Sequence, residues 1–364
     1  MRTRSCLTVL TGILLAIALA APAGAKTMTV FAGLPPKAQM PAGVTVPKAL
    51  NFNGFFGRTI TINVGDSVNW IFSQRVIHTV TFPAKGQQAP PFVQPDPAHP
   101  YAGFNDPAGN PFWFNGQTSL VTPAAVALPT TEKSTDGTGY RNSGIPPGGK
   151  AYSYKLRFTK AGTFKYLCEI HPGMRGTVRV VPKGAKAVRV PSAAQDRATA
   201  TKELLLARQS ATRLNRFSPR ADTVVAGHDS GSVAWFKFYP SVRTVPVGGS
   251  VRFITSSKSE VHTVAFGPTA YRDANEAAVL VTPQPAGPPL FQMNPLIFLP
   301  SDPPPSLPPY DGTNHGNGFL NTGPIDSDPK TPFPSSATVR FTKAGSYTFE
   351  CLIHPGMEAT IKVV

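Results

Sequence analysis

Short runs in which apolar and polar residues alternate recur along the chain and predict β-strands. Side chains of a strand point alternately to its two faces, so alternation indicates a strand with one face in a core. In the first half, such runs lie at 26–33, 57–72, 151–158 and 176–181. In the second half, similar runs lie at 223–227, 241–255, 337–341 and 359–364. The pattern predicts an all-β fold in which one arrangement of strands occurs twice.

The two halves also share a segment that combines cysteine, histidine and methionine. Residues 158–174 read FTKAGTFKYLCEIHPGM, and residues 341–357 read FTKAGSYTFECLIHPGM. Upstream, two further predicted strands, IHTVTF and VHTVAF, each carry one histidine. The spacing between equivalent positions agrees within one residue, which indicates duplication of one domain. The candidate metal ligands are His78, Cys168, His171 and Met174 in the first half, and His262, Cys351, His354 and Met357 in the second.

One thiolate, two imidazoles and one thioether form a ligand set that suits copper, with methionine as a weak axial ligand. A lone Cys-x-x-His motif would be weak evidence, but here the complete set occurs twice. A degenerate or zinc-loaded site is the alternative. A disulfide between Cys168 and Cys351 is a second alternative, although their equivalent positions in two repeats favour a separate role for each. We therefore predict one copper ion in each half.

The N-terminal residues 1–25 have the pattern of a signal peptide. Arg2 and Arg4 precede an apolar stretch, and Ala23-Gly24-Ala25 offers a small-residue cleavage site. The apolar stretch is short for a membrane span, so a retained anchor is the weaker alternative. We expect an exported protein, periplasmic or extracellular, with no transmembrane anchor after cleavage.

The remaining chain divides into a first domain at 26–182, a linker at 183–221 and a second domain at 222–364. Long insertions at 83–149 and 267–335 contain most of the 40 prolines, so neither helices nor central strands are expected there. Their aromatic residues predict ordered, loop-rich excursions packed on each domain, with disorder as the alternative.

The linker contains the one helix that the sequence predicts. The segment 193–216 is rich in alanine, leucine, arginine and glutamine, and Ser192 is a candidate N-cap. We expect Leu204, Leu205 and Leu206 to face a domain.

Each half resembles the plastocyanin/amicyanin group of cupredoxins. The resemblance rests on the loops CEIHPGM at 168–174 and CLIHPGM at 351–357, and on the upstream histidines. It implies two Greek-key β-sandwich domains, a type 1 (blue) copper in each, and single-electron transfer. It further implies that His171 and His354 are the exposed ligands through which electrons leave. Thr79 and Thr263 stand where the family usually has asparagine, and a threonine hydroxyl can also form hydrogen bonds.

Charge and the remaining histidines bear on partners and on activity. The formal net charge of +16 favours an acidic redox partner or a negative envelope surface, although it also fits the ordinary solubility of a basic exported protein. Export argues against nucleic acid as a partner. The chain lacks the His-x-His motifs of laccase-like oxidases, and we expect His99, His228 and His315 to be surface or hydrogen-bonded histidines.

Three functions follow, of which an electron carrier is favoured over the other two. The second is a copper-delivery protein without redox turnover. The third is a copper oxidoreductase similar to nitrite reductase, which would need a further copper between the domains. The sequence does not predict the oligomeric state.

Overall fold

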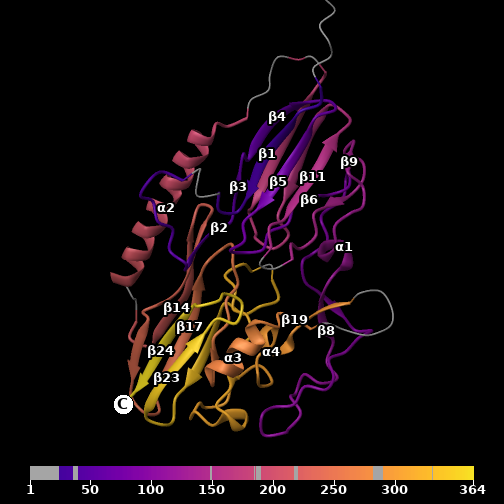
Figure 1. The fold of residues 1–364 in the computed structure, drawn as a ribbon. Helices are drawn as coiled ribbons and strands as arrows, with labels where there is room; N and C mark the ends of the chain where they lie inside the picture. The colour runs from indigo at the N-terminus through magenta and orange to yellow at the C-terminus, as the bar shows by residue number, and fades with distance from the viewer. Residues whose placement is uncertain are drawn as a thin grey trace, which may run out of the picture.

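The computed structural model describes residues 24–35, 40–147, 150–183, 185, 190–216, 220–281, 290–329 and 331–364. Nearly all of the predicted signal peptide lies outside these described residues. Figure 1 shows two β-sandwiches, one formed mainly by each half of the chain, with a long helix along one side. The fold is therefore mainly β, as the alternating pattern predicted.

The first sandwich consists of two five-stranded sheets. One has the order β3 (Phe55–Phe56), β1 (Thr27–Ala32), β5 (Ser67–Phe72), β11 (Ser153–Phe158) and β9 (Ser134–Thr135). The other has the order β10 (Arg141–Asn142), β6 (Thr81–Phe82), β12 (Gly162–Leu167), β13 (Arg175–Val181) and β4 (Thr59–Asn63).

The second sandwich repeats this arrangement. One sheet has the order β2 (Leu50–Phe52), β15 (Val233–Tyr239), β14 (Thr223–Ser230), β17 (Ser250–Ser256) and β22 (Ser336–Arg340). The other has the order β16 (Val242–Val245), β24 (Glu358–Val363), β23 (Gly345–Glu350), β18 (Ala265–Phe266) and β21 (Leu320–Asn321). In the first sandwich β1 pairs in parallel with β5, and β4 with β13. In the second sandwich β14 pairs in parallel with β17, and β16 with β24.

Alternation along the strands builds the core, as β11 illustrates. Tyr154, Leu156 and Phe158 are buried, whereas Lys155 and Arg157 between them are exposed. This period of two places every second side chain between the sheets.

The strands predicted to carry the upstream histidines are shorter than expected. β6 begins only at Thr81, so His78 lies in irregular backbone before it, and β18 likewise begins only at Ala265. The N–H groups of Thr79 and Thr263 point at cysteine sulfur atoms and not at a neighbouring strand. Strand pairing is therefore interrupted at the threonines, although His262 forms an isolated antiparallel bridge with Ile325.

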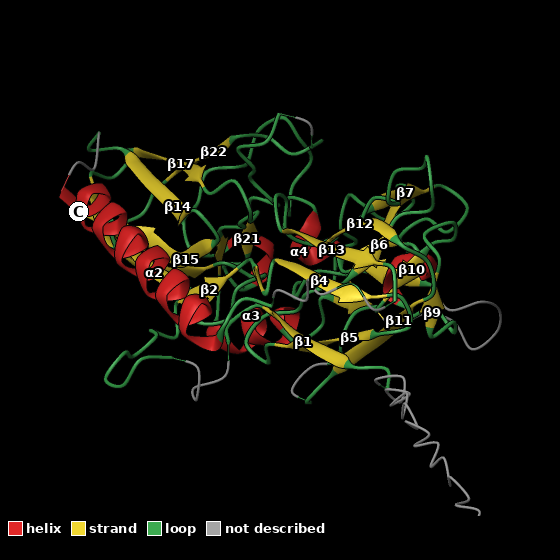
Figure 2. Ribbon diagram, turned by 90° about the horizontal axis from the view of Figure 1, so that it is seen from above, coloured by secondary structure: helices red, strands yellow, loops and turns green. Residues whose placement is uncertain are grey.

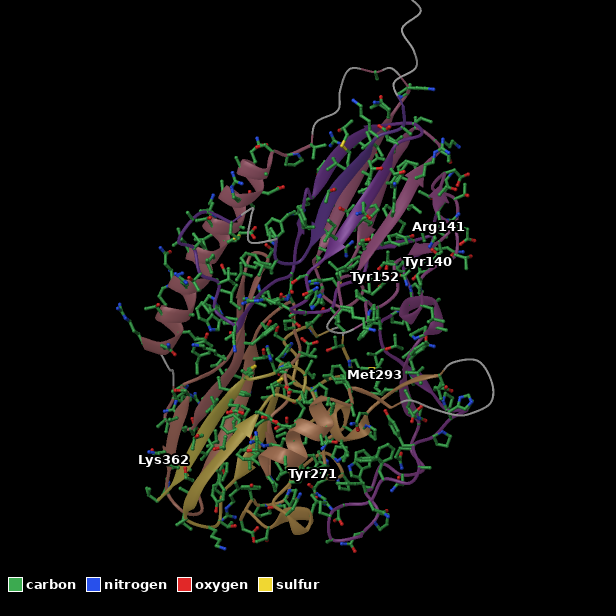
Figure 3. The ribbon with its side chains drawn as sticks, in the orientation of Figure 1. Tyr140, Arg141, Tyr152, Tyr271, Met293 and Lys362 are labelled. Atoms are coloured by element: carbon green, nitrogen blue, oxygen red, sulfur yellow. The ribbon has the colours of Figure 1, made fainter. Side chains whose placement is uncertain are left out.

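The insertions are ordered, and they pair with each other as well as packing on the sandwiches. They form a four-stranded sheet of the order β19 (Leu280–Val281), β20 (Phe291–Met293), β8 (Ser119–Thr122) and β7 (Gln94–Asp96). Its central pair joins β8 of the first half to β20 of the second. The hydroxyl of Tyr101 donates to the carbonyl of Met293, a buried residue of this junction that is labelled in Figure 3.

Short helices in the insertions contradict the expectation that none would form there. They are α1 (Ala124–Ala127), α3 (Thr269–Glu276), α4 (Pro295–Phe298) and a 3₁₀ turn at Asn314–Gly316. The prolines lie at the helix starts, where a missing N–H costs nothing. Pro268 directly precedes α3, and Pro295 is the first residue of α4. Proline content thus limits helix length here without preventing helices.

The linker helix α2 (Ala193–Arg216) covers the predicted segment and begins at the predicted cap. The Ser192 hydroxyl accepts from the N–H of Gln195, whose side chain accepts from the N–H of Ser192. This reciprocal pair is a capping box. Figure 2 shows α2 alongside β14, β15 and β2.

One face of α2 packs across the junction of the two halves. Its buried residues recur every three or four positions: Ala200, Leu204, Ala207 and Ala211. Leu204 packs in one cluster with Phe31 and Phe52 of the first half and Val233 of the second. Leu205 and Leu206 are 53% and 43% exposed, so the expectation that all three leucines face a domain is wrong for these two. Successive helix positions diverge by about 100°, which allows only one of the three to point inward.

We expect Leu204→Ala to lower the free energy of unfolding by about 2–4 kcal/mol, because it leaves a cavity at this junction. The matched variant Leu205→Ala changes an exposed side chain and should shift stability by less than about 0.5 kcal/mol. Urea denaturation of both variants measures the difference. Equal effects would show that α2 does not hold the halves together through this face.

A second link between the halves is the ring of His315. Its Nδ1 lies 3.3 Å from a carboxylate oxygen of Asp106, and its Nε2 lies 3.3 Å from one of Asp302. The hydrogen bond to Asp302 raises the pKa of His315, and Asp106 adds to this effect. The link is therefore complete below the usual histidine pKa and is lost as pH rises through the raised value.

Accordingly, His315→Gln should lower the melting temperature more at pH 5.5 than at pH 9. Thermal unfolding of variant and parent at both values tests this. His99→Gln removes an exposed histidine that pairs with Asp96, and it should change little at either pH. A His315→Gln effect independent of pH would contradict the role of the charged ring.

Candidate metal centre

Two groups of buried side chains have the composition and spacing of metal sites. The ligand atoms of His78, Cys168 and His171 all lie within 4.8 Å of one another, and so do those of His262, Cys351 and His354. Among the described residues, only these two sets bring ligand atoms of three histidine, cysteine or acidic side chains within 4.8 Å of one another. The structure thus brings together the predicted nitrogen and sulfur ligands of each half.

In the first group, the Nδ1 atoms of His78 and His171 are 3.0 Å apart, and Cys168 Sγ lies 3.4 Å from Nδ1 of His171. His78 comes from the segment before β6, and Cys168 directly follows β12. His171 lies on the loop between β12 and β13. Ligands of one metal ion, each at about 2.0–2.3 Å from it, lie about 3–4 Å apart, as these atoms do.

The second group has nearly the same geometry. Cys351 Sγ lies 3.9 Å from Nδ1 of His262 and 3.3 Å from Nδ1 of His354. The two rings have their centroids 4.7 Å apart, the same separation as in the first group. Equivalent strands therefore deliver equivalent atoms in both halves.

Each cysteine is held as a thiolate by its surroundings. Burial would raise the pKa of Cys168, but His171 and His78 lower it well below its usual value. The pKa of Cys351 is lowered in the same way by His354 and His262. The backbone N–H groups of Thr79 and Thr263 donate to the two sulfur atoms at 3.3 and 3.4 Å. A thiolate with a backbone donor is the form in which cysteine binds metal.

The same two threonines brace the ligand loops. The hydroxyl of Thr79 accepts from the N–H of Glu169, and that of Thr263 accepts from the N–H of Leu352, both at 2.8 Å. The residue after each cysteine is thereby fixed to the segment that carries the upstream histidine. In each half, threonine thus ties the two ligand-bearing segments together.

The methionines lie buried at the ends of these loops. The N–H of Cys168 donates to the carbonyl of Met174, and the N–H of Met174 donates to that of His171. The equivalent bonds join Cys351, Met357 and His354. Met174 and Met357 are 2% and 1% exposed and pack in the same cores as the cysteines. Their role as axial ligands remains a prediction.

Two glycines make room for the upstream histidines, and we did not predict their role. A Cβ atom on Gly33 would lie 2.5 Å from Nε2 of His78, and one on Gly227 would lie 1.9 Å from Nε2 of His262. Both Nε2 atoms are buried without a hydrogen-bond partner. The rings therefore use Nδ1, the atom on the sulfur side, for any bond they form. The sequence pattern that could have indicated the role of these glycines is the repeated segment TVFAG and TVVAG, which ends in Gly33 and Gly227.

These donor sets fit copper. Each offers one thiolate and two imidazole Nδ1 atoms in a dry pocket, with a thioether in the same core, which is the combination that soft and borderline metals prefer. The two His-Cys-His groups could form two copper sites.

The expectation that His171 and His354 are exposed is wrong. They are 1% and 4% exposed, and Glu260 of the second half contacts both rings. Phe236 stacks on the His354 ring with centroids 4.1 Å apart. The expectation came from a resemblance to single-domain cupredoxins, which does not indicate which surfaces become buried when two domains pack together.

A buried glutamate lies between these two histidines, and sequence reasoning missed it. Nε2 of His171 lies 3.3 Å from Oε1 of Glu260, and Nε2 of His354 lies 3.3 Å from Oε2. Asn53 Nδ2 also donates to Oε1, at 2.6 Å. Burial would raise the pKa of Glu260, but His171 and then His354 lower it well below its usual value. The equivalent residue in the first half is Val76, so no repeat marked Glu260 in the sequence.

The remaining histidines lie apart from both groups, as expected. His99 contacts Asp96, and His228 lies 3.1 Å from the hydroxyl of Ser256. His315 bridges two aspartates, as described above.

No protein-family model matches the chain, and no curated protein matches it in sequence. Solved structures similar to it include an amicyanin variant in the Cu(I) state, with 19% identity over 43% of this chain and 82% of the other and a TM-score of 0.21. Plastocyanin from Dryopteris crassirhizoma has 20% identity over 39% of this chain and 99% of the other, with a TM-score of 0.21. A purple cupredoxin from Nitrosopumilus maritimus has 12% identity over 39% and 98%, also with a TM-score of 0.21.

We expect Gly33→Ala to abolish copper binding in the first half, because the new methyl group would displace the His78 ring. Copper content by atomic emission should fall from two ions per chain to one. Gly86→Ala is the matched control: its φ of +78° resembles the +83° of Gly33, but nothing lies within 4 Å of the new Cβ. Retention of two copper ions in Gly33→Ala would show that the space left by Gly33 does not position His78.

Proposed function

We propose that the protein is an exported single-electron carrier with one type 1 copper in each half. The observation that carries this proposal is the convergence of one thiolate and two imidazole nitrogens in each of two buried groups. The proposed ligands are His78, Cys168, His171 and Met174, and His262, Cys351, His354 and Met357.

Bound copper would supply a Cu(I)/Cu(II) couple at each site. The chain's own contribution is to keep the ligands fixed while the charge changes. The threonine hydroxyls and the bonds between cysteine and methionine backbones hold each loop in one conformation. A site that does not rearrange on oxidation exchanges electrons with little reorganisation, which suits a carrier.

Burial of the ligands favours a carrier over a copper-delivery protein. His78 and His262 are 0% exposed, and both cysteines are at most 4% exposed. Handing a copper ion to another protein requires an incoming ligand to reach the metal, whereas an electron needs no such opening. The burial of the ligands therefore supports electron transfer as the main function.

The surface closest to the first site is the candidate place for a partner. Pro172 and Gly173 are exposed, and a cleft of about 620 Å³ is lined by Gly173, Met174 and Phe55. A redox partner that docks there would approach a proposed ligand directly. The net charge of +16 favours an acidic partner, and the N-terminal pattern supports export. Within the described residues, no helix is long and apolar enough to cross a membrane.

Cysteine replacement tests the proposal. Cys168→Ser and Cys351→Ser should each lose one copper and about half of the intense visible thiolate-to-copper absorption, and the double variant should lose both. His228→Gln, a histidine outside both groups, should retain two coppers and full absorption. The measurements are copper content and the visible spectrum of the Cu(II)-loaded chain. A colourless native protein that readily releases Cu(I) would instead favour delivery, and a third, type 2 copper signal would favour an oxidoreductase.

A further inference from the structure

The two metal groups face each other across one carboxylate. Glu260 lies between the Nε2 atoms of His171 and His354, with one oxygen toward each ring. Both rings direct Nδ1 toward their own cysteine, so the proton on Nε2 is directed to the glutamate. One acidic side chain therefore contacts a ligand of both sites.

The carboxylate is enclosed and held in place. Its side chain is 7% exposed, and its third contact is the amide of Asn53 from the first half. Asn53 also donates to Ser259, next to Glu260. The equivalent position in the first half is occupied by Val76, which packs on the core of the second half. Glu260 thus places one carboxylate between the two loop histidines, where exact duplication would have placed either two such residues or none.

The charge balance gives this carboxylate a specific consequence, which rests on the proposed function. The thiolates of Cys168 and Cys351 and the carboxylate of Glu260 contribute three negative charges. With two Cu(II) ions, the ligands and Glu260 together carry +1; with one Cu(II) and one Cu(I) they are neutral; and with two Cu(I) ions they carry −1. A net charge is unfavourable in a buried region, so the half-reduced state is the favoured one.

We propose that Glu260 is a positioning and potential-setting residue shared by both copper sites, which makes the state with one electron on the pair the electrically neutral state. The first electron then enters readily, because it removes a net charge, and the second enters reluctantly, because it creates one. Each step adds one electron from the redox partner and converts one Cu(II) to Cu(I). Because its two oxygens lie 3.3 Å from a ring of each site, Glu260 lowers the electron affinity of both sites together.

The decisive variant is Glu260→Gln, which keeps the shape of the side chain and removes its charge. Its effect is measured on each site separately, in the Cys168→Ser and Cys351→Ser backgrounds, by reduction followed through the visible band. We expect the electron affinity of both sites to rise by about tenfold or more, as loss of a negative charge a few ångströms away should produce. Glu260→Asp keeps the charge and should stay closer to the native affinities at both sites.

Glu203→Gln is the matched control, because Glu203 is also a partly buried acid near the junction but bonds to Ser232 and to no histidine. It should leave both affinities unchanged. A Glu260→Gln effect at one site or at neither, or equal effects of Gln and Asp, would overturn the proposal and leave Glu260 as a structural link.

Glu260→Ala, in the same two backgrounds, gives a second readout if Glu260→Gln does not fold, because it also removes the charge. It should raise the electron affinity of both sites, and an unchanged affinity at either site would overturn the proposal. Absence of the intense thiolate-to-copper absorption from the native chain loaded with Cu(II) would instead overturn the proposed function itself.

Discussion

The structure depends on how the two sandwich ends that carry the proposed metal ligands pack against each other. In a single sandwich, the loop that carries cysteine, histidine and methionine would end at solvent. Here both loop histidines are buried, and both contact Glu260 of the second half. Burial removes water from the thiolates and imidazoles and strengthens every charge interaction among them. The two candidate sites therefore share one environment, although each takes its metal ligands from its own half.

Several connections hold this packing. β2 of the first half extends a sheet of the second, β8 pairs with β20 between the insertions, and α2 packs across both halves. None of these belongs to the repeated strand pattern. The duplicated part of the sequence builds two similar sandwiches, and the parts that differ between the halves fix how they meet. The insertions thus serve to join the halves as well as to cover them.

Much of the fold and of the site could be predicted from the sequence, and what was missed has physical reasons. Period-2 patterns identify strands such as β11 because each strand has one buried face. The repeated Cys-x-x-His-x-x-Met motif located the cysteines and the loop histidines because metal ligands impose fixed spacing. Helix α3 was missed because proline content was read without regard to position, and Pro268 lies at its start. Glu260 was missed because its role depends on contact between halves, which no local pattern encodes.

The central claim is that each half binds copper through one thiolate and two imidazoles. X-ray absorption at the copper edge, on the full chain loaded with two Cu(II) ions, measures this most directly. The account predicts one short copper–sulfur bond and two copper–nitrogen bonds for each copper. Coordination by nitrogen and oxygen alone, with Cys168 and Cys351 outside the metal's reach, would contradict it.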